Sequence, residues 1–106
     1  MTKNEDKTRE VLTLTSRTNN GNFFESDNAK YLLRNCDRKF EGVKNKPQYY
    51  ISRKQGNELK FLSGLFPTRI ENQYSWDEKN AQGMKKFMIA EFVNNGDQLI
   101  LKTKQI

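Results

Sequence analysis

The residues that could do chemistry in this sequence are lysines, arginines and tyrosines gathered between residues 28 and 60. This segment holds nine basic residues against three acidic ones, a net charge of +6 that equals the charge of the whole 106-residue chain. Cations that follow a phosphate backbone, together with a ring that stacks on a base, are how many proteins hold single-stranded nucleic acid. The segment therefore predicts a surface that contacts nucleic acid or a nucleoprotein complex, with these candidate residues: Lys30, Arg34, Arg38, Lys39, Lys44, Lys46, Tyr50, Arg53 and Lys54.

Two adjacent tyrosines, Tyr49 and Tyr50, lie in the middle of this charge. Neighbouring residues on a strand point to opposite faces, so we expect Tyr49 to face the core with Ile51 and Tyr50 to be exposed beside the cations. In the alternative interpretation, both rings cover edges of the core, and the basic residues form a solvated face that keeps the protein soluble. The residue types alone fit both interpretations.

The residues that are missing exclude several kinds of active site. The chain has no histidine and a single cysteine, Cys36. It therefore lacks a histidine relay, a histidine-ligated zinc, a structural zinc site and an internal disulfide. No glycine-rich phosphate-binding loop occurs either. We predict a non-enzymatic protein without metal or cofactor, in which Cys36 is a small buried hydrophobe and the adjacent acids Asp77 and Glu78 are solvated.

Two other functions remain open from the sequence. The first is an inhibitor or adaptor of the phage or mobile-element type, such as an anti-defence protein, which binds a host protein directly and needs no motif. The second is a histidine-free ribonuclease toxin that shares acid–base roles among Tyr50, Arg53, Lys54 and Glu58. Lysine and tyrosine titrate far above neutral pH, so this second function requires strong pKa shifts.

A helix is predicted over about residues 28–40. Asp27 has the side chain of a helix N-cap, and Gly42 would end the helix. Apolar residues recur at steps of three and four, which is the spacing of one helix face: Ala29, Leu32, Leu33, Cys36 and Phe40. Lys30, Arg34 and Arg38 then form a basic stripe beside that face. The alternative is a short strand over residues 31–33.

The rest of the chain predicts antiparallel strands. Residues 11–15 form a first strand, which an Asn-Gly turn joins to a strand beginning at Phe23 and Phe24. Residues 48–53, 59–65, 70–76, 85–93 and 99–104 read as five more strands, with separations too short for crossover helices. Alternation places one parity of each strand in the core. Because large aromatic residues are usually buried, five more are assigned to the core: Phe61, Phe66, Trp76, Phe87 and Phe92.

These elements predict an α+β fold that is mainly antiparallel β. We expect about five strands in a meander or small, partly open barrel, with one helix and an N-terminal strand. The whole of residues 1–106 forms one domain, and residues 1–9 are a flexible arm. No apolar stretch is long enough to span a membrane and no secretory signal is visible, so the expected location is the cytoplasm, with no membrane partner.

Overall fold

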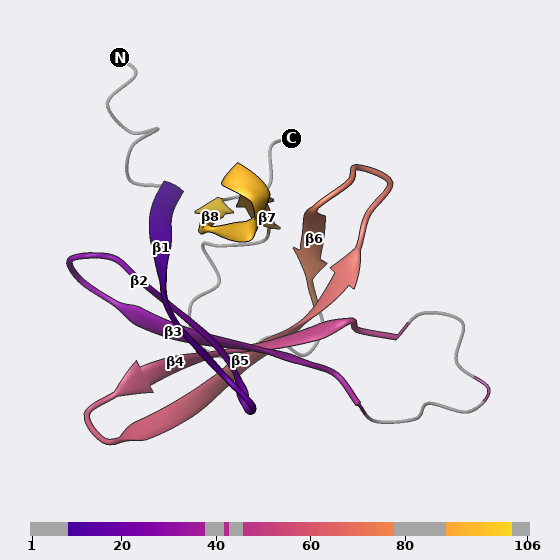
Figure 1. Cartoon of the computed structure of the whole chain (residues 1–106). Helices are drawn as coiled ribbons and strands as arrows, with labels where there is room; N and C mark the ends of the chain where they lie inside the picture. The colour runs from indigo at the N-terminus through magenta and orange to yellow at the C-terminus, as the bar shows by residue number, and fades with distance from the viewer. Residues whose placement is uncertain (1–8, 38–41, 43–45, 78–88, 103–106) are drawn as a thin grey trace, which may run out of the picture.

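The computed structural model describes residues 9–37, 42, 46–77 and 89–102. These residues form a closed barrel of eight antiparallel strands (Figure 1). The strands are β1 (Arg9–Thr18), β2 (Gly21–Glu25), β3 (Lys30–Asn35), β4 (Tyr49–Gln55), β5 (Glu58–Pro67), β6 (Gln73–Trp76), β7 (Ile89–Val93) and β8 (Gln98–Lys102). A 3₁₀ turn, η2 (Asn94–Gly96), joins β7 to β8.

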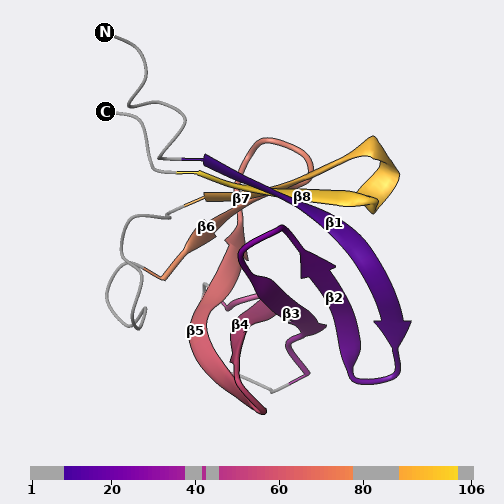
Figure 2. The same ribbon diagram turned by 90° about the vertical axis from the view of Figure 1, so that its left-hand side faces the viewer.

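Each strand pairs with the next one along the chain, and β1 pairs with β8 to close the barrel, as Figure 2 shows. Tight turns make this meander possible. Gly21 has φ +134°, Gly56 has φ +62°, and Asn94 and Asn95 have φ 54° and 58°. Glycine and asparagine adopt such positive φ values at the lowest cost, which explains why these residues stand at the turns.

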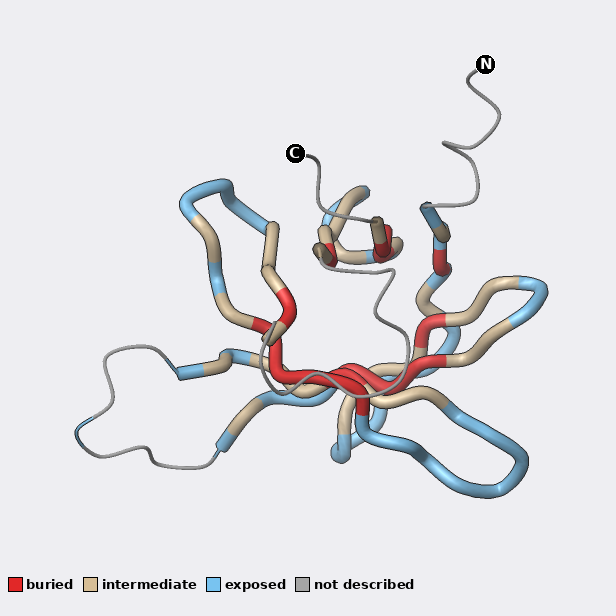
Figure 3. The backbone as a smooth tube through the Cα atoms, turned by 180° about the vertical axis from the view of Figure 1, so that it is seen from behind, coloured by how far each residue is buried: buried red, intermediate tan, exposed pale blue. Residues whose placement is uncertain are grey.

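The core fills the inside of the barrel (Figure 3, red). Alternate residues of neighbouring strands face one another there, as in the pairs Leu12–Leu99 and Leu33–Ile51. The fully buried side chains of this core come from strands β1 to β5 and β8: Leu12, Phe24, Tyr31, Ile51, Leu62, Leu65, Leu99 and Leu101. An eight-stranded barrel has an interior that side chains of this size can fill.

The predicted helix over residues 28–40 is wrong, because residues 30–35 form strand β3. Tyr31, Leu32 and Leu33 are all buried, and Tyr31 and Leu33 face inward between β2 and β4. A short apolar run fits both periodicities, and pairing with two flanking strands decided in favour of the strand. Asp27 is exposed in the β2–β3 turn, where Ser26 accepts the amide hydrogen of Asn28 at 3.2 Å.

The predicted count of about five strands with a partly open sheet is also wrong. The N-terminal strands belong to the same sheet as the later ones, and the pairing of β1 with β8 leaves no open edge between them. The strand expected over residues 70–76 begins only at Gln73, because the preceding residues form a turn in which the Gln73 amide donates to the Ile70 carbonyl at 3.1 Å. The mainly antiparallel character is confirmed.

The predicted aromatic core is partly right. Trp76 is buried, Phe92 packs against the core, and Phe66 is half-buried. Phe61 is 42% exposed, so its assignment to the core is wrong. Phe87 lies outside the described residues.

The reason for the exposed Phe61 is a β-bulge in β5. Ile51 pairs with Ser63, but the next residue, Ser52, pairs with Phe61, so Leu62 is an extra residue in β5. A bulge shifts the alternation of the strand by one position. Leu65 therefore faces the core, whereas Phe61, at the same parity, faces outward.

Cys36 is half-buried and follows the end of β3, so it does not lie on a buried helix face as predicted. Within the described part of the chain, no helix has the length and apolar character needed to cross a membrane.

Candidate nucleic-acid interface

The outward side of strands β2 to β5 carries a lateral row of residues in register. Phe23 on β2 pairs with Leu32 on β3, Leu32 with Ser52 on β4, and Ser52 with Phe61 on β5. Phe61 is the ring most open to solvent in this row, since Phe23 is half-buried. The row therefore places two aromatic side chains on the outside of a curved sheet.

A second outward row lies beside the first. Arg34 on β3 pairs with Tyr50 on β4, and Tyr50 pairs with Gly64 on β5. The guanidinium carbon of Arg34 lies 5.3 Å from the centre of the Tyr50 ring, which is a cation–π contact. The Tyr50 ring meets the Phe61 ring edge-on, with centroids 5.7 Å apart and planes at 72°. Arg34, Tyr50 and Phe61 thus form one contiguous cluster across three strands.

Lysines stand at the other end of this surface. The ammonium of Lys30 lies 4.8 Å from the centre of the Phe23 ring and 3.6 Å from the Glu25 carboxylate. A hydrogen bond from the Thr15 hydroxyl, at 2.7 Å, and the charge of Lys30 hold the pKa of Glu25 below its usual value. Lys54 extends from β4 opposite Leu59. We call the set Phe23, Lys30, Arg34, Tyr50, Lys54 and Phe61 the aromatic–basic face.

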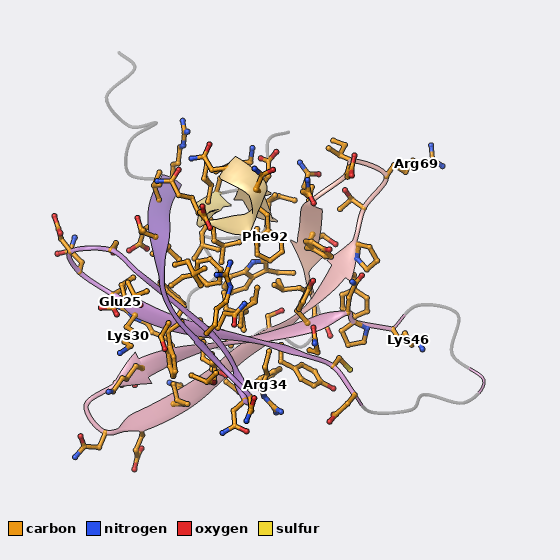
Figure 4. All side chains as sticks on the ribbon, viewed as in Figure 1. Glu25, Lys30, Arg34, Lys46, Arg69 and Phe92 are labelled. Carbon is orange, nitrogen blue, oxygen red and sulfur yellow. The ribbon has the colours of Figure 1, made fainter. Side chains whose placement is uncertain are left out.

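Arg34 and Lys54 are held less closely by carboxylates than Lys30 is, although the charge of Lys54 also helps to lower the pKa of Glu25. Neither forms an ion pair with a carboxylate in the part of the chain that the structure describes. Arg34 is exposed, and so is Lys54. In Figure 4, Arg34 lies in the lower part of the view, apart from the paired Glu25 and Lys30 at the left. This surface can therefore offer positive charge to an anion while its rings offer apolar area.

The structure brings together four of the nine candidates from the sequence: Lys30, Arg34, Tyr50 and Lys54. Arg53 has the opposite orientation, with its guanidinium 5.9 Å from the centre of the Tyr31 ring. Lys46 is exposed in the segment before β4. Arg38, Lys39 and Lys44 lie outside the described residues.

The two adjacent tyrosines point to opposite faces of the sheet, as predicted, but Tyr50 is less exposed to solvent than predicted. Tyr49 packs against the core. Tyr50 is on the outer side but only half-exposed, because Arg34 and Phe61 cover its ring. The predicted outward direction of Tyr50 is therefore right, and its exposure is lower than predicted.

The sequence interpretation missed Phe23 and Phe61. Phe23 is adjacent to the buried Phe24, so alternation alone could have placed one of the two rings outside. Phe61 became an outward residue through the bulge at Leu62, and the nearby Gly64 was the available signal, since a glycine inside a strand often marks a bulge. Gly64 has a second role, because a Cβ at this position would lie 3.0 Å from the Cβ of Pro47.

The described residues offer the face no cluster of metal ligands. No set of three or more His, Cys, Asp or Glu side chains is placed to hold a metal ion in residues 9–37, 46–77 and 89–102. The cluster suggested for a ribonuclease is divided, because Arg53 and Lys54 are neighbours on β4 and point to opposite faces. What this geometry can do is bind a polyanion that carries planar groups.

Comparison of the chain with models of protein families, with curated proteins and with solved structures found no match.

Proposed function

We propose that this protein binds single-stranded nucleic acid through the aromatic–basic face, without a catalytic step. The observation that carries the proposal is the cluster of Arg34, Tyr50 and Phe61 on an outward surface, in which the cation lies over the Tyr50 ring and the Phe61 ring meets the Tyr50 ring edge-on. Bases stack on such rings whatever their sequence, and cations beside them follow the phosphates. A compartment that holds nucleic acid is required, so we also propose a cytoplasmic location.

The expected strength of the electrostatic part follows from the cations on the face. If Lys30, Arg34 and Lys54 each neutralise one phosphate of a single strand, the log of the affinity should fall against the log of the salt concentration with a slope of about −2. Phosphate contacts position a strand without reading its sequence, so the affinity should depend little on base composition.

The test is a fluorescence anisotropy titration with a labelled oligothymidylate of about 15 nucleotides, a length sufficient for one small barrel. The informative variant is Arg34→Glu, which should weaken binding and make the salt slope shallower by about 0.7. The matched control is Arg69→Glu, which changes the net charge by the same amount. Arg69 is exposed between β5 and β6 and lies far from Arg34 in Figure 4.

Two outcomes would overturn the proposal. One is the absence of binding to any single-stranded DNA or RNA at low salt. The other is an equal loss of affinity in Arg34→Glu and Arg69→Glu, which would mean that net charge alone holds the strand. Incubation of the same labelled RNA with the protein separates binding from cleavage, and we expect the RNA to remain intact.

A direct contact with another protein is the second candidate function. The observation that favours it is the exposed apolar area on β5, where Leu59 is 47% exposed and Phe61 is 42% exposed. Both side chains face outward beside Lys54. Exposed apolar residues that adjoin one another mark interaction surfaces. An inhibitor or adaptor would use this area, and a failure of the nucleic-acid titration would make it the leading candidate.

A further inference from the structure

One end of the barrel has a cavity that the aromatic–basic face does not account for. In an antiparallel meander, the connections β1–β2, β3–β4, β5–β6 and β7–β8 all lie at the same end. A cavity of about 710 Å³ lies there between the β1–β2 turn and the end of β3, and one of about 490 Å³ lies beside the β7–β8 turn. Asn22, Tyr49 and Phe92 line both, so the two form one mouth.

The floor of this mouth is aromatic. The Tyr49 ring lies 5.8 Å from the Phe92 ring and 5.1 Å from the Tyr74 ring, with planes at 73° and 81°. Phe24 packs beneath Phe92 at 6.1 Å. Burial and the neighbouring Tyr49 raise the pKa of the Tyr74 hydroxyl above its usual value. Tyr49 and Phe92 are only half-buried, so they present ring surface to whatever enters the mouth.

Amide side chains lie above the floor. Asn22 pairs with the inward-facing Leu33, and Asn35 pairs with the inward-facing Tyr49, so both lie on the inward parity of their strands. The asparagines at 72, 94 and 95 have positive φ and are explained by their turns. Asn22 and Asn35 are strand residues without a positive φ, at positions where asparagine is disfavoured; Asn35 is the last residue of β3.

Charged groups stand at the edge of the same mouth. Arg34 lines the larger cavity and also covers the Tyr50 ring, so the mouth opens directly onto the aromatic–basic face. Arg17 lines the smaller cavity, and its guanidinium lies 3.8 Å from the carboxylate of Asp97. Asp37 lines the larger cavity and can accept a hydrogen bond from an exocyclic amino group.

We infer that this mouth takes one nucleobase, held by Tyr49 and Phe92, with its phosphate directed to Arg34. Asparagine amides pair with the donor and acceptor edge of a base, and aromatic rings pack on its planes. The larger cavity, of about 710 Å³, is by itself within the range of cavities that hold small-molecule ligands, and the mouths of β-barrels are frequent sites for such ligands. The base can come from two sources. One is a strand bound to the aromatic–basic face, and for this source the inference rests on the proposed function. The other is a free mononucleotide.

The experiment measures both sources separately. Titration of the full chain with AMP and with CMP, followed by ¹H–¹⁵N correlation spectra, should shift the amide signals of Asn22, Asn35 and Tyr49. Asn35 is exposed, and Asn35→Asp leaves the volume of its side chain almost unchanged. The substitution replaces the amide donor with a negative charge that repels phosphate. It should weaken mononucleotide binding about tenfold. The matched control is Asn57→Asp, in the β4–β5 turn at the opposite end of the barrel. It should leave the mononucleotide affinity unchanged.

The outcomes distinguish this inference from the proposed function. Strand binding without any shift at the mouth, and with the same strand affinity in Asn35→Asp, would overturn the inference and leave the proposed function standing. Shifts at the mouth with AMP or CMP but no strand binding would support the inference and overturn the proposed function. Phe61→Ala should weaken strand binding and leave the mononucleotide affinity unchanged; an equal loss of both would also overturn the inference.

Discussion

The buried hydroxyl of Tyr31 makes the stability of this barrel depend on pH in the alkaline range. The side chain is fully buried, and its hydroxyl donates a hydrogen bond to Oε1 of Glu10 at 3.3 Å. The other oxygen of this carboxylate, Oε2, accepts from the Ser26 hydroxyl at 2.7 Å. Burial and the charge of Glu10 raise the pKa of Tyr31 to about 12, against the usual value of 10.0.

The sign of the effect follows from which state keeps the proton. Below pH 10 both the folded and the unfolded chain carry a protonated Tyr31. Between pH 10 and 12 the unfolded chain loses this proton while the folded chain keeps it, so the free energy of unfolding falls as the pH rises. A shift of two pKa units amounts to about 2.7 kcal/mol in total, of which about 1.4 kcal/mol is lost by pH 11.

The perturbation that isolates this effect is Tyr31→Phe. At pH 8 the variant should be less stable by about 1 kcal/mol, because it lacks the hydrogen bond to Glu10. At pH 11 the two proteins should be about equally stable, because only the wild type has lost the Tyr31 contribution. Lysines and the other tyrosines titrate in both proteins, so they cancel in the difference.

Urea unfolding followed by the fluorescence of Trp76, the single tryptophan and a buried one, measures this difference at each pH. The reasoning would be refuted by a stability difference that stays the same from pH 8 to pH 11. A difference that grows with pH would contradict it even more directly, since it would mean that the folded state favours the ionised hydroxyl.

Three further outcomes follow from the structure. Phe61→Ala should cost only about 1–2 kcal/mol of stability, because the ring is already 42% exposed, but it should weaken strand binding by about 1–3 kcal/mol. Val11→Ala, on β1 and 43% exposed, should leave strand binding unchanged in the same titration. Gly21→Ala should destabilise the barrel by more than about 2 kcal/mol, because the new Cβ would lie 2.7 Å from a backbone oxygen at φ +134°, whereas Gly56→Ala meets nothing and should cost about 1 kcal/mol in urea unfolding. Cys36 is half-buried, so a thiol reagent should modify it in the native protein without global unfolding, and a reaction rate limited by unfolding would show it to be buried.

The sequence placed Lys30 and Arg34 on one face of an element, and they do share a face, although the element is a strand and not the predicted helix. Lys30 and Arg34 were assigned to one stripe of a helix, because residues four apart share a helix face. Residues four apart also share a face of a strand, since side chains alternate with a period of two. Lys30 and Arg34 therefore share a face in the strand, as they would have in the predicted helix. Arg38, the next residue of the predicted stripe, lies outside the described residues.

The closure of the barrel could not be predicted from local patterns. The alternation of Leu12 and Leu14 and that of Leu99 and Leu101 indicated two strands with one buried face each. Their pairing joins residues more than eighty positions apart, and nothing in either segment alone specifies that partner. The register between two such distant strands depends on how all the inward side chains pack together. Composition and periodicity do not specify that packing.

The bulge at Leu62 links the fold to the candidate surface. Without the extra residue, Leu59, Phe61 and Leu65 would share one side of β5, and alternation alone would assign all three to the core. With it, the core takes Leu62 and Leu65, and the outer side takes Leu59 and Phe61. A barrel that needed only a filled interior would gain nothing by turning a leucine and a phenylalanine outward, because each exposed apolar side chain forgoes burial that stabilises the fold. Irregularities of this kind often re-aim a side chain toward a site. We therefore regard Phe61 as the residue of this face whose position is hardest to explain by folding alone, and as the one whose substitution tests the proposed function most directly.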